Sequence, residues 1–151
     1  MSPEQKALVK ETWRNVVPIA DTAATLFYER LFEIDPELRA LFDGVDLASQ
    51  GTKLTQAINM VVGALDRLDE VSPVVAELGR RHAGYGVTDA HYDTVSAALL
   101  WTLEKGLGEA WSDDAKSAWS AAYTVLATIM RSAAAEIGSA HAGRRAASVA
   151  A

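Results

Sequence analysis

The 151-residue sequence contains no cysteine. This absence excludes a disulfide framework, a thiolate nucleophile and every zinc site that uses cysteine ligands. It also fits a reducing cytosol, where disulfides are rare. Stability must therefore come from a packed core, and with 50% hydrophobic residues the chain has the material for one.

Positive charge and long apolar runs are also scarce. The chain has 14 Lys and Arg residues against 20 Asp and Glu, a formal net charge of −6. No basic stripe follows any predicted helix, so nucleic acid and anionic membranes are poor partners. The apolar stretch at residues 57–65 is interrupted by Asn59 and Gly63 and is too short to span a bilayer. Residues 1–10 are polar and do not resemble a signal peptide, so we expect a soluble, cytoplasmic protein.

Common catalytic and phosphate-binding motifs are missing as well. HExxH, GxSxG, the Walker A loop and GxGxxG do not occur. The three histidines, His82, His91 and His141, are too widely spread for the usual ligand spacings of a zinc site. The sequence therefore carries no conventional enzyme motif.

Helical periodicity runs through most of the chain, and no alternation of period two predicts a strand. A capping residue followed by proline predicts helix starts at residues 2–3, 35–36 and 72–73. Gly84 and Gly86 are expected to end the helix that starts after Pro73. We predict an all-α domain over residues 1–137, followed by a disordered tail at 138–151. About seven helices are expected, at residues 3–18, 19–34, 37–42, 48–68, 74–83, 89–107 and 112–137.

A haem site needs fewer protein ligands than a zinc site. One axial imidazole, an apolar slot and a few polar groups at its rim suffice. His82 lies late in the predicted helix 74–83, four residues after Leu78, so the two side chains share a face. Gln50 and Leu54 are also four residues apart, which places a polar group beside a bulky apolar one. Candidates for the walls of such a slot are Tyr28, Phe42 and Val95.

Each of these residues also has an ordinary structural explanation. A lone histidine near a helix end, such as His82, is usually a surface or capping residue. Tyr28 would most often be a core tyrosine with a satisfied hydroxyl, and Gln50 a solvated residue at a helix start. Periodicity alone leaves both interpretations open.

The order and spacing of several segments resemble the globin family. The second and third helices of that family are similar to LFYERLFEIDP at residues 26–36 followed by LF at 41–42. The distal helix is similar to QGTKL at 50–54, the proximal helix to LGRRH at 78–82 with YGV at 85–87, and the last helix to WSAAY at 119–123. The resemblance covers residues 3–137. It is closest to bacterial single-domain globins related to the globin part of flavohaemoglobins, which overlap with neuroglobin-like proteins.

The resemblance implies a globin fold packed around a pocket for haem b. His82 falls on the proximal iron ligand, and Phe42 on the aromatic residue that stacks on the haem. Tyr28 falls on the tyrosine of the ligand side. Gln50 falls on the distal polar position and Leu54 on the apolar position beside it.

Further matches imply the rim and walls of the haem pocket. Lys53 and Arg81 fall near the haem edge, where a cation meets a propionate. Tyr92 matches a tyrosine that pairs with the proximal histidine. Apolar and aromatic residues expected against the haem are Leu78, Val87, Val95 and Tyr123.

The sequence departs from flavohaemoglobins at two points. Those proteins continue into a flavin and nicotinamide reductase module, which these residues lack, so we expect a separate reductase. They also pair the proximal histidine with a glutamate, but the aligned position here is Ala134, and Glu136 lies roughly 200° further around the helix. A weaker partner for His82 reduces the electron push toward O–O cleavage and disfavours a peroxidase. Compared with neuroglobin-like proteins, Gln50 stands in place of a distal histidine, which removes the usual route to coordination by two histidines.

The implied function is reversible binding of O₂, and also of CO and NO, at a His-ligated haem iron. Donors from Tyr28 and Gln50 would stabilise negative charge on the bound gas. NO dioxygenation or O₂ delivery with an external reductase is the favoured role, and whether the protein is an enzyme stays open. One alternative is a gas or redox sensor globin that acts through a protein partner. Another is a haem-free all-α interaction module.

Overall fold

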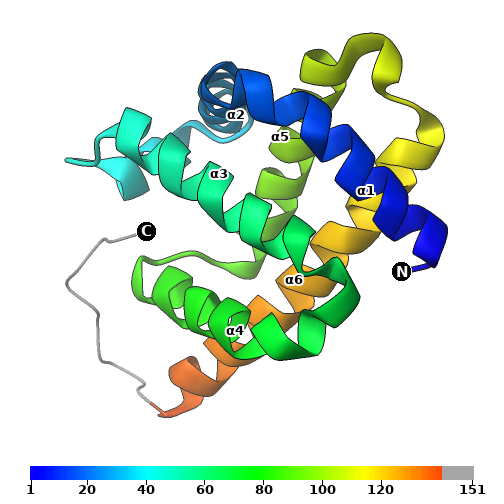
Figure 1. Ribbon diagram of the computed structural model, residues 1–151. Coiled ribbons are helices and arrows are strands. Elements are labelled where there is room, and N and C mark those ends of the chain that lie inside the picture. The colour runs from blue at the N-terminus through cyan, green and yellow to red at the C-terminus, as the bar shows by residue number, and fades with distance from the viewer. Residues whose placement is uncertain (141–151) are drawn as a thin grey trace.

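Helices make up nearly all of the chain that the structure describes. The structure, a computed structural model, describes the backbone of residues 1–140 and the side chains of residues 1–136. Within residues 1–140 it contains no strand, which confirms the predicted all-α class. The α-helices are α1 (Pro3–Val16), α2 (Ala20–Ile34), α3 (Leu47–Gly63), α4 (Leu68–Gly84), α5 (Asp89–Leu107) and α6 (Asp113–Ala140), as Figure 1 shows. Short 3-10 helices are η1 (Val17–Ile19), η2 (Pro36–Phe42), η3 (Leu65–Arg67) and η4 (Gly108–Ala110).

Two predicted helix starts appear as expected at the N-terminal half of the chain. Ser2 caps α1 through a capping box, in which its side chain accepts from the Gln5 amide while the Gln5 side chain accepts from the Ser2 amide. Asp35 caps η2, where its carboxylate accepts from the Glu37 amide at 3.2 Å. The short helix predicted after Pro36 is therefore present, as a 3-10 helix rather than an α-helix.

The predicted start of the proximal helix at residue 74 is wrong. α4 begins at Leu68, and Pro73 lies inside it. A proline in the second turn of a helix removes one backbone hydrogen bond. Carboxylates in the first turn favour the earlier start, because they interact with the positive end of the helix dipole. One of them, Glu70, also forms an ion pair with Arg67 at 3.2 Å. The preceding helix correspondingly ends at Gly63 and not at residue 68.

The last helix is longer than expected. α6 continues to Ala140, three residues beyond the predicted end at 137. The rest of the predicted tail, residues 141–151, lies outside the described residues.

A polar network is buried where α1 packs against α6. The Trp119 indole donates to the hydroxyl of buried Thr12 at 2.8 Å, and this hydroxyl donates to the Leu8 carbonyl at 2.7 Å. The neighbouring Trp13 indole donates to Asn59 at 3.0 Å, which ties α1 to α3. Both buried indole N–H groups thus have acceptors, so this part of the core carries no desolvation penalty from them.

The two helices that carry the predicted haem-site residues are held by different partners. α3 packs on α2, whereas α4 packs on α6 (Figure 1). A glycine marks each crossing. A Cβ added at Gly51 would lie 2.9 Å from the Ala24 Cβ, and one added at Gly79 would lie 2.4 Å from the Met130 carbonyl oxygen. These close approaches fix the helix segments next to Gln50 and His82.

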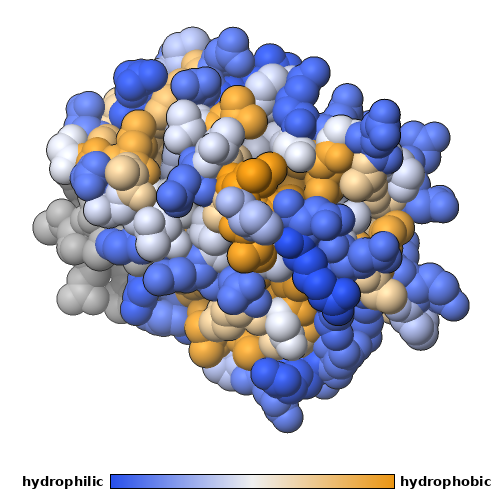
Figure 2. All heavy atoms as spheres, turned by 45° about the horizontal axis from the view of Figure 1, so that its top comes forward, coloured by the Kyte–Doolittle hydropathy of each residue, from blue (hydrophilic) through white to orange (hydrophobic). Residues whose placement is uncertain are grey.

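The surface is mixed in character. Figure 2 shows hydrophilic residues interspersed with smaller apolar patches on one face of the molecule. The described residues include no helix whose length and apolar character would let it cross a bilayer.

Candidate functional site

An aromatic cluster forms around Tyr28 on α2. The Tyr28 ring packs edge-on against Phe42 at a centroid distance of 5.6 Å and stacks with Phe32 at 6.3 Å. Leu54 of α3 and Val95 of α5 pack into the same cluster. Four elements thus bring together four of the residues that the sequence predicts for a haem pocket: Tyr28, Phe42, Leu54 and Val95.

The Tyr28 hydroxyl has an unusual environment for a core tyrosine. Burial raises the pKa of Tyr28 to about 12, and the neighbouring Gln50 side chain partly opposes this shift. The hydroxyl therefore stays protonated at physiological pH. The polar side chain beside the hydroxyl is that of Gln50. The two predicted distal polar residues are therefore adjacent.

His82 lies in the last turn of α4 in a defined protonation state. Burial lowers the pKa of His82 below its ordinary value, so the imidazole is neutral at pH 7. Its Nδ1 lies 2.6 Å from the Leu78 carbonyl oxygen, which can only accept a hydrogen bond. Nδ1 therefore carries the proton, and Nε2 keeps its lone pair. A neutral imidazole with one anchored nitrogen and one free nitrogen is the donor that an axial ligand of haem must provide.

The predicted rim residues are two cations on the surface. Lys53 and Arg81 are exposed, and neither forms an ion pair with the side chains of residues 1–136. Leu78 and Val87 are half-buried and belong to neither of the two described apolar clusters. The structure thus places Lys53 on α3, Leu78 and Arg81 on α4, and Val87 just after α4.

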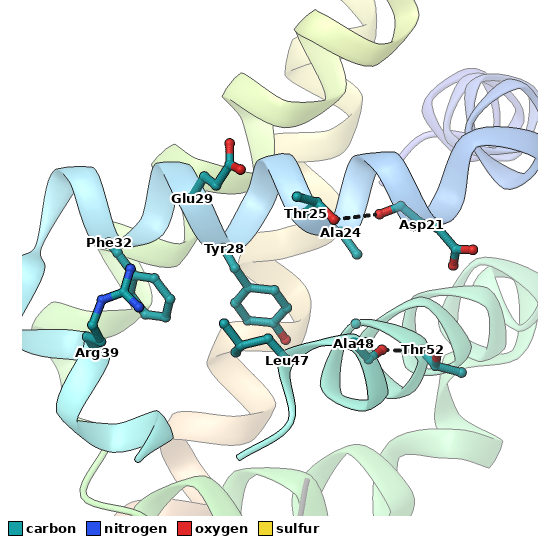
Figure 3. A pocket seen from close by; sticks show the side chains of 11 residues that line it. Asp21, Ala24, Thr25, Tyr28, Glu29, Phe32, Arg39, Leu47, Ala48 and Thr52 are labelled. Atoms are coloured by element: carbon teal, nitrogen blue, oxygen red, sulfur yellow. Dashed lines mark hydrogen bonds between the residues drawn. The ribbon is translucent and has the colours of Figure 1, made fainter. Parts of the chain in front are cut away.

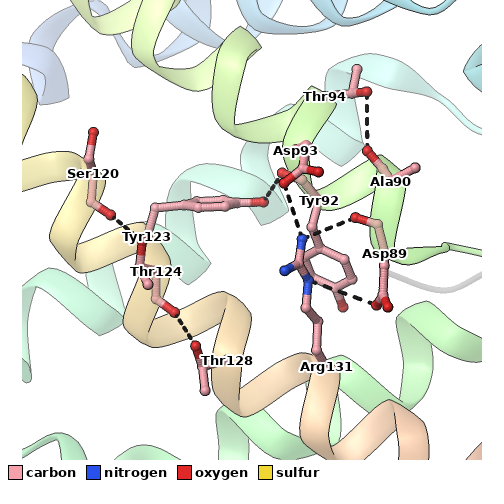
Figure 4. Close-up of polar contacts among 10 residues, drawn as sticks. All are labelled: Asp89, Ala90, Tyr92, Asp93, Thr94, Ser120, Tyr123, Thr124, Thr128 and Arg131. Atoms are coloured by element: carbon pink, nitrogen blue, oxygen red, sulfur yellow. Dashed lines mark hydrogen bonds and ion pairs between the residues drawn. The ribbon is translucent and has the colours of Figure 1, made fainter.

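Tyr92 and Tyr123 are joined to each other. The Tyr123 hydroxyl donates to the Tyr92 carbonyl at 2.6 Å, and the Arg131 guanidinium lies 4.9 Å above the Tyr92 ring (Figure 4). The Tyr92 hydroxyl is buried and has no hydrogen-bond partner within the part of the chain that the structure describes, and burial raises its pKa. No hydrogen bond joins it to His82, because the Nδ1 proton of His82 is directed to the Leu78 carbonyl.

The position of Glu136 agrees with the departure from the flavohaemoglobin pattern. Its carboxylate is largely exposed and forms an ion pair with Arg80 at 3.8 Å. Ala134, the residue aligned with the family's glutamate, is half-buried and has no side-chain polar group. The described residues therefore provide no carboxylate partner for His82.

A cavity that the sequence did not predict lies between α2, η2 and the start of α3. It has a volume of about 540 Å³, and Figure 3 shows the Tyr28 side chain projecting into it from α2 toward Leu47. Of the predicted site residues, only Tyr28 lines it. No sequence motif marks this cavity, because its lining comes from small residues on two helices that meet only in the folded protein. These include Ala24, Ala48, Gly51 and Thr52.

Comparison with known proteins gives the class that this fold and this histidine define. A family model described as Globin matches residues 25–130, so the chain belongs to the globin family. A flavohemoprotein of Bordetella bronchiseptica is 35% identical over 134 residues, which cover 86% of this chain and 33% of the relative. The chain thus spans about one third of the length of the flavohemoproteins it matches.

Other relatives are matched over nearly their whole length. An anaerobic nitrite reductase of Oryza sativa subsp. indica is 31% identical over 137 residues, which cover 86% of this chain and 93% of the relative. A neuroglobin of Danio rerio is 26% identical over 143 residues, covering 86% and 90%. Among solved structures, an engineered carbene transferase from Rhodothermus marinus superimposes with a TM-score of 0.83 at 24% identity, covering 93% of this chain and 97% of that one. This superposition confirms the globin fold.

Proposed function

We propose that the protein is a haem-binding globin that reversibly binds O₂, CO and NO, with His82 as the axial ligand of a b-type haem. When bound, haem supplies the iron at which diatomic gases bind. The observation that carries the proposal is the neutral, half-buried His82, whose Nδ1 is fixed by the Leu78 carbonyl and whose Nε2 keeps its lone pair for a metal. Several relatives are named flavohemoprotein or neuroglobin, which supports the same assignment.

Tyr28 and Gln50 are proposed to face the bound gas. The Tyr28 hydroxyl is protonated, buried and beside an amide, so it is a donor held ready in a site of low polarity. Gln50 can orient this hydroxyl through its amide oxygen or add a second donor through its amide nitrogen. Both residues would therefore favour a ligand that carries partial negative charge.

The remaining residues are proposed to hold the cofactor. Phe42, Leu54 and Val95 would give apolar contacts, because they already share one cluster with Tyr28. Lys53 and Arg81 would meet the propionates, since each is an exposed cation without a carboxylate partner among residues 1–136. Further apolar contacts are proposed for Leu78, Val87 and Tyr123. Tyr92 is proposed as the polar group on the proximal side of the haem, since its hydroxyl has no hydrogen-bond partner among the described residues.

We propose NO dioxygenation as the specific role of the protein, and O₂ delivery when NO is absent. The likeness to flavohemoproteins at 35% identity supports this choice. Residues 1–151 contain no flavin or nicotinamide motif. We therefore propose that electrons come from a reductase outside these residues.

Haem titration of the purified protein tests the proposal. We expect a strong Soret band that saturates at one haem per chain, and a further shift of this band when CO is added to the reduced protein. The band should form at neutral pH, where His82 is neutral, and weaken at acid pH as the imidazole is protonated. A protein that folds but gives no Soret band would favour the haem-free interaction module.

Replacing Tyr28 by phenylalanine is expected to speed O₂ dissociation by about tenfold to a hundredfold. A hydrogen bond to a charged acceptor contributes roughly 1.5–3 kcal/mol, against about 1 kcal/mol for a neutral one. CO should respond much less, because bound CO develops little negative charge on its outer atom. Gln50→Leu should act in the same direction but more weakly, since its longer side chain holds a donor less firmly.

Stopped-flow O₂ displacement measures these rates in each single variant and in the double variant. If both donors share one acceptor, the two effects should be non-additive. Tyr123→Phe is the matched control, because that hydroxyl already donates to the Tyr92 carbonyl. An O₂ dissociation rate that is unchanged in Tyr28→Phe would return Tyr28 to the role of a core residue.

A further inference from the structure

The cavity beside Tyr28 is an open groove on the outer side of the α2–α3 crossing. The side chains of Tyr28, Phe32 and Leu47 form its base, and Figure 3 shows them between the two helices that frame the groove. Its α3 wall consists of small residues, Ala48, Gly51 and Thr52. The groove, about 540 Å³ in volume, is therefore wide for a diatomic molecule.

The base of the groove is also one wall of the proposed ligand side. Tyr28, Phe32 and Leu47 pack in the same apolar cluster as Phe42 and Leu54. Each of the three thus contacts the groove on one side and the cluster on the other. These side chains therefore lie between the groove and the rest of the cluster, and their movement would open a passage between the two.

We propose that this groove is the path by which diatomic gases reach and leave the Tyr28 side of the pocket. The inference rests on the proposed haem function and deepens it. Small apolar molecules such as O₂, CO and NO need no polar partner to cross an apolar layer. Charged side chains on the rim, Asp21, Glu29 and Arg39, are exposed and hydrated, whereas the base is aromatic and aliphatic. The other described cavity is much smaller, about 30 Å³.

Filling the groove from its α3 wall tests the proposal. Ala48 and Thr52 are exposed, so Ala48→Trp and Thr52→Trp can place an indole in the groove without entering the core. A blocked path raises the barrier for ligands in both directions and leaves the bound and free states unchanged. The association and dissociation rate constants for CO should therefore fall by the same factor, about tenfold for an added barrier of ~1.4 kcal/mol, at constant Kd.

Flash photolysis and CO replacement give the two rate constants for each variant. Gln56→Trp is the matched control, because Gln56 is exposed on α3 but does not line the groove. Unchanged rates in both groove variants, or the same change in Gln56→Trp, would overturn the path. A change in Kd through one rate constant alone would also overturn it, because that pattern marks altered binding. Wild-type protein without a Soret band would instead overturn the proposed function, and this inference with it.

Discussion

Alanine at position 82 is expected to abolish the iron–histidine stretching band in the resonance Raman spectrum of the reduced, haem-loaded protein. Nε2 of His82 is the only nitrogen that the proposal assigns to the iron, and alanine has no donor to replace it. Apolar burial can still retain haem in the pocket, so a Soret band alone does not decide the matter. The vibrational band reports the bond itself and is therefore the measurement of choice.

Two further measurements separate the loss of a ligand from general damage. His91→Ala is the matched control: His91 accepts from the Thr88 amide at 3.0 Å and caps α5, so its loss should weaken the helix start but leave the iron–histidine band intact. Free imidazole added to His82→Gly should restore a five-coordinate reduced spectrum, because the truncated side chain leaves room for it. A band that persists in His82→Ala would show that another group ligates the iron.

The helical order was predictable because the local signals and the tertiary structure agree over most of the chain. The Ser2 capping box and the Asp35 cap need only neighbouring residues, and both form as predicted. Pro73 misled the prediction because proline after serine usually opens a helix. Here the helix begins five residues before Pro73, at Leu68. The favourable first turn outweighs the cost of the one backbone hydrogen bond that Pro73 removes.

The candidate site was predictable only in part. Periodicity places Tyr28 and Gln50 on their helices, but whether the hydroxyl meets an amide or a carbonyl depends on how α2 crosses α3. His82 shows the same division. Its contact with the Leu78 carbonyl, four residues earlier, follows from helix geometry. The absence of a hydrogen bond between His82 and Tyr92 depends on how α4 and α5 pack and could not be predicted. The groove left no signal, because its small lining residues also suit an ordinary helix surface.

The family resemblance included two glycines whose role only the structure explains. Gly51 follows Gln50, and Gly79 precedes His82 by three residues. At each position two helices approach so closely that a Cβ atom would lie within 3.0 Å of a neighbouring atom. The difference is that Gly51 faces the side chain of Ala24, whereas Gly79 faces the backbone of Met130. Backbone can move only together with its helix. Gly79 therefore tolerates an added Cβ less well than Gly51 does.

Gly79→Ala is therefore expected to destabilise the protein by about 2 kcal/mol. The added Cβ would lie 2.4 Å from the Met130 carbonyl oxygen and 2.6 Å from its Cα, so α4 and α6 must separate. Overpacking of this kind costs roughly 1–3 kcal/mol. Three backbone atoms of Met130 lie within 3.0 Å of the added Cβ, which argues for the upper part of that range. Alanine recovers up to ~1 kcal/mol through its higher helix propensity. For a chain of this size the net loss lowers the Tm by about 4–8 °C.

Thermal unfolding followed by circular dichroism, with and without haem, measures this loss. Gly63→Ala is the matched control, because Gly63 also lies in an α-helix but its added Cβ would meet nothing within 4 Å. That variant should be as stable as the wild type or up to ~1 kcal/mol more stable. Since Gly79 lies one turn before His82, separation of α4 from α6 should also broaden the Soret band or lower haem affinity in Gly79→Ala. If Gly79→Ala instead matches Gly63→Ala in stability, α4 and α6 do not approach as closely at Met130 as the structure places them.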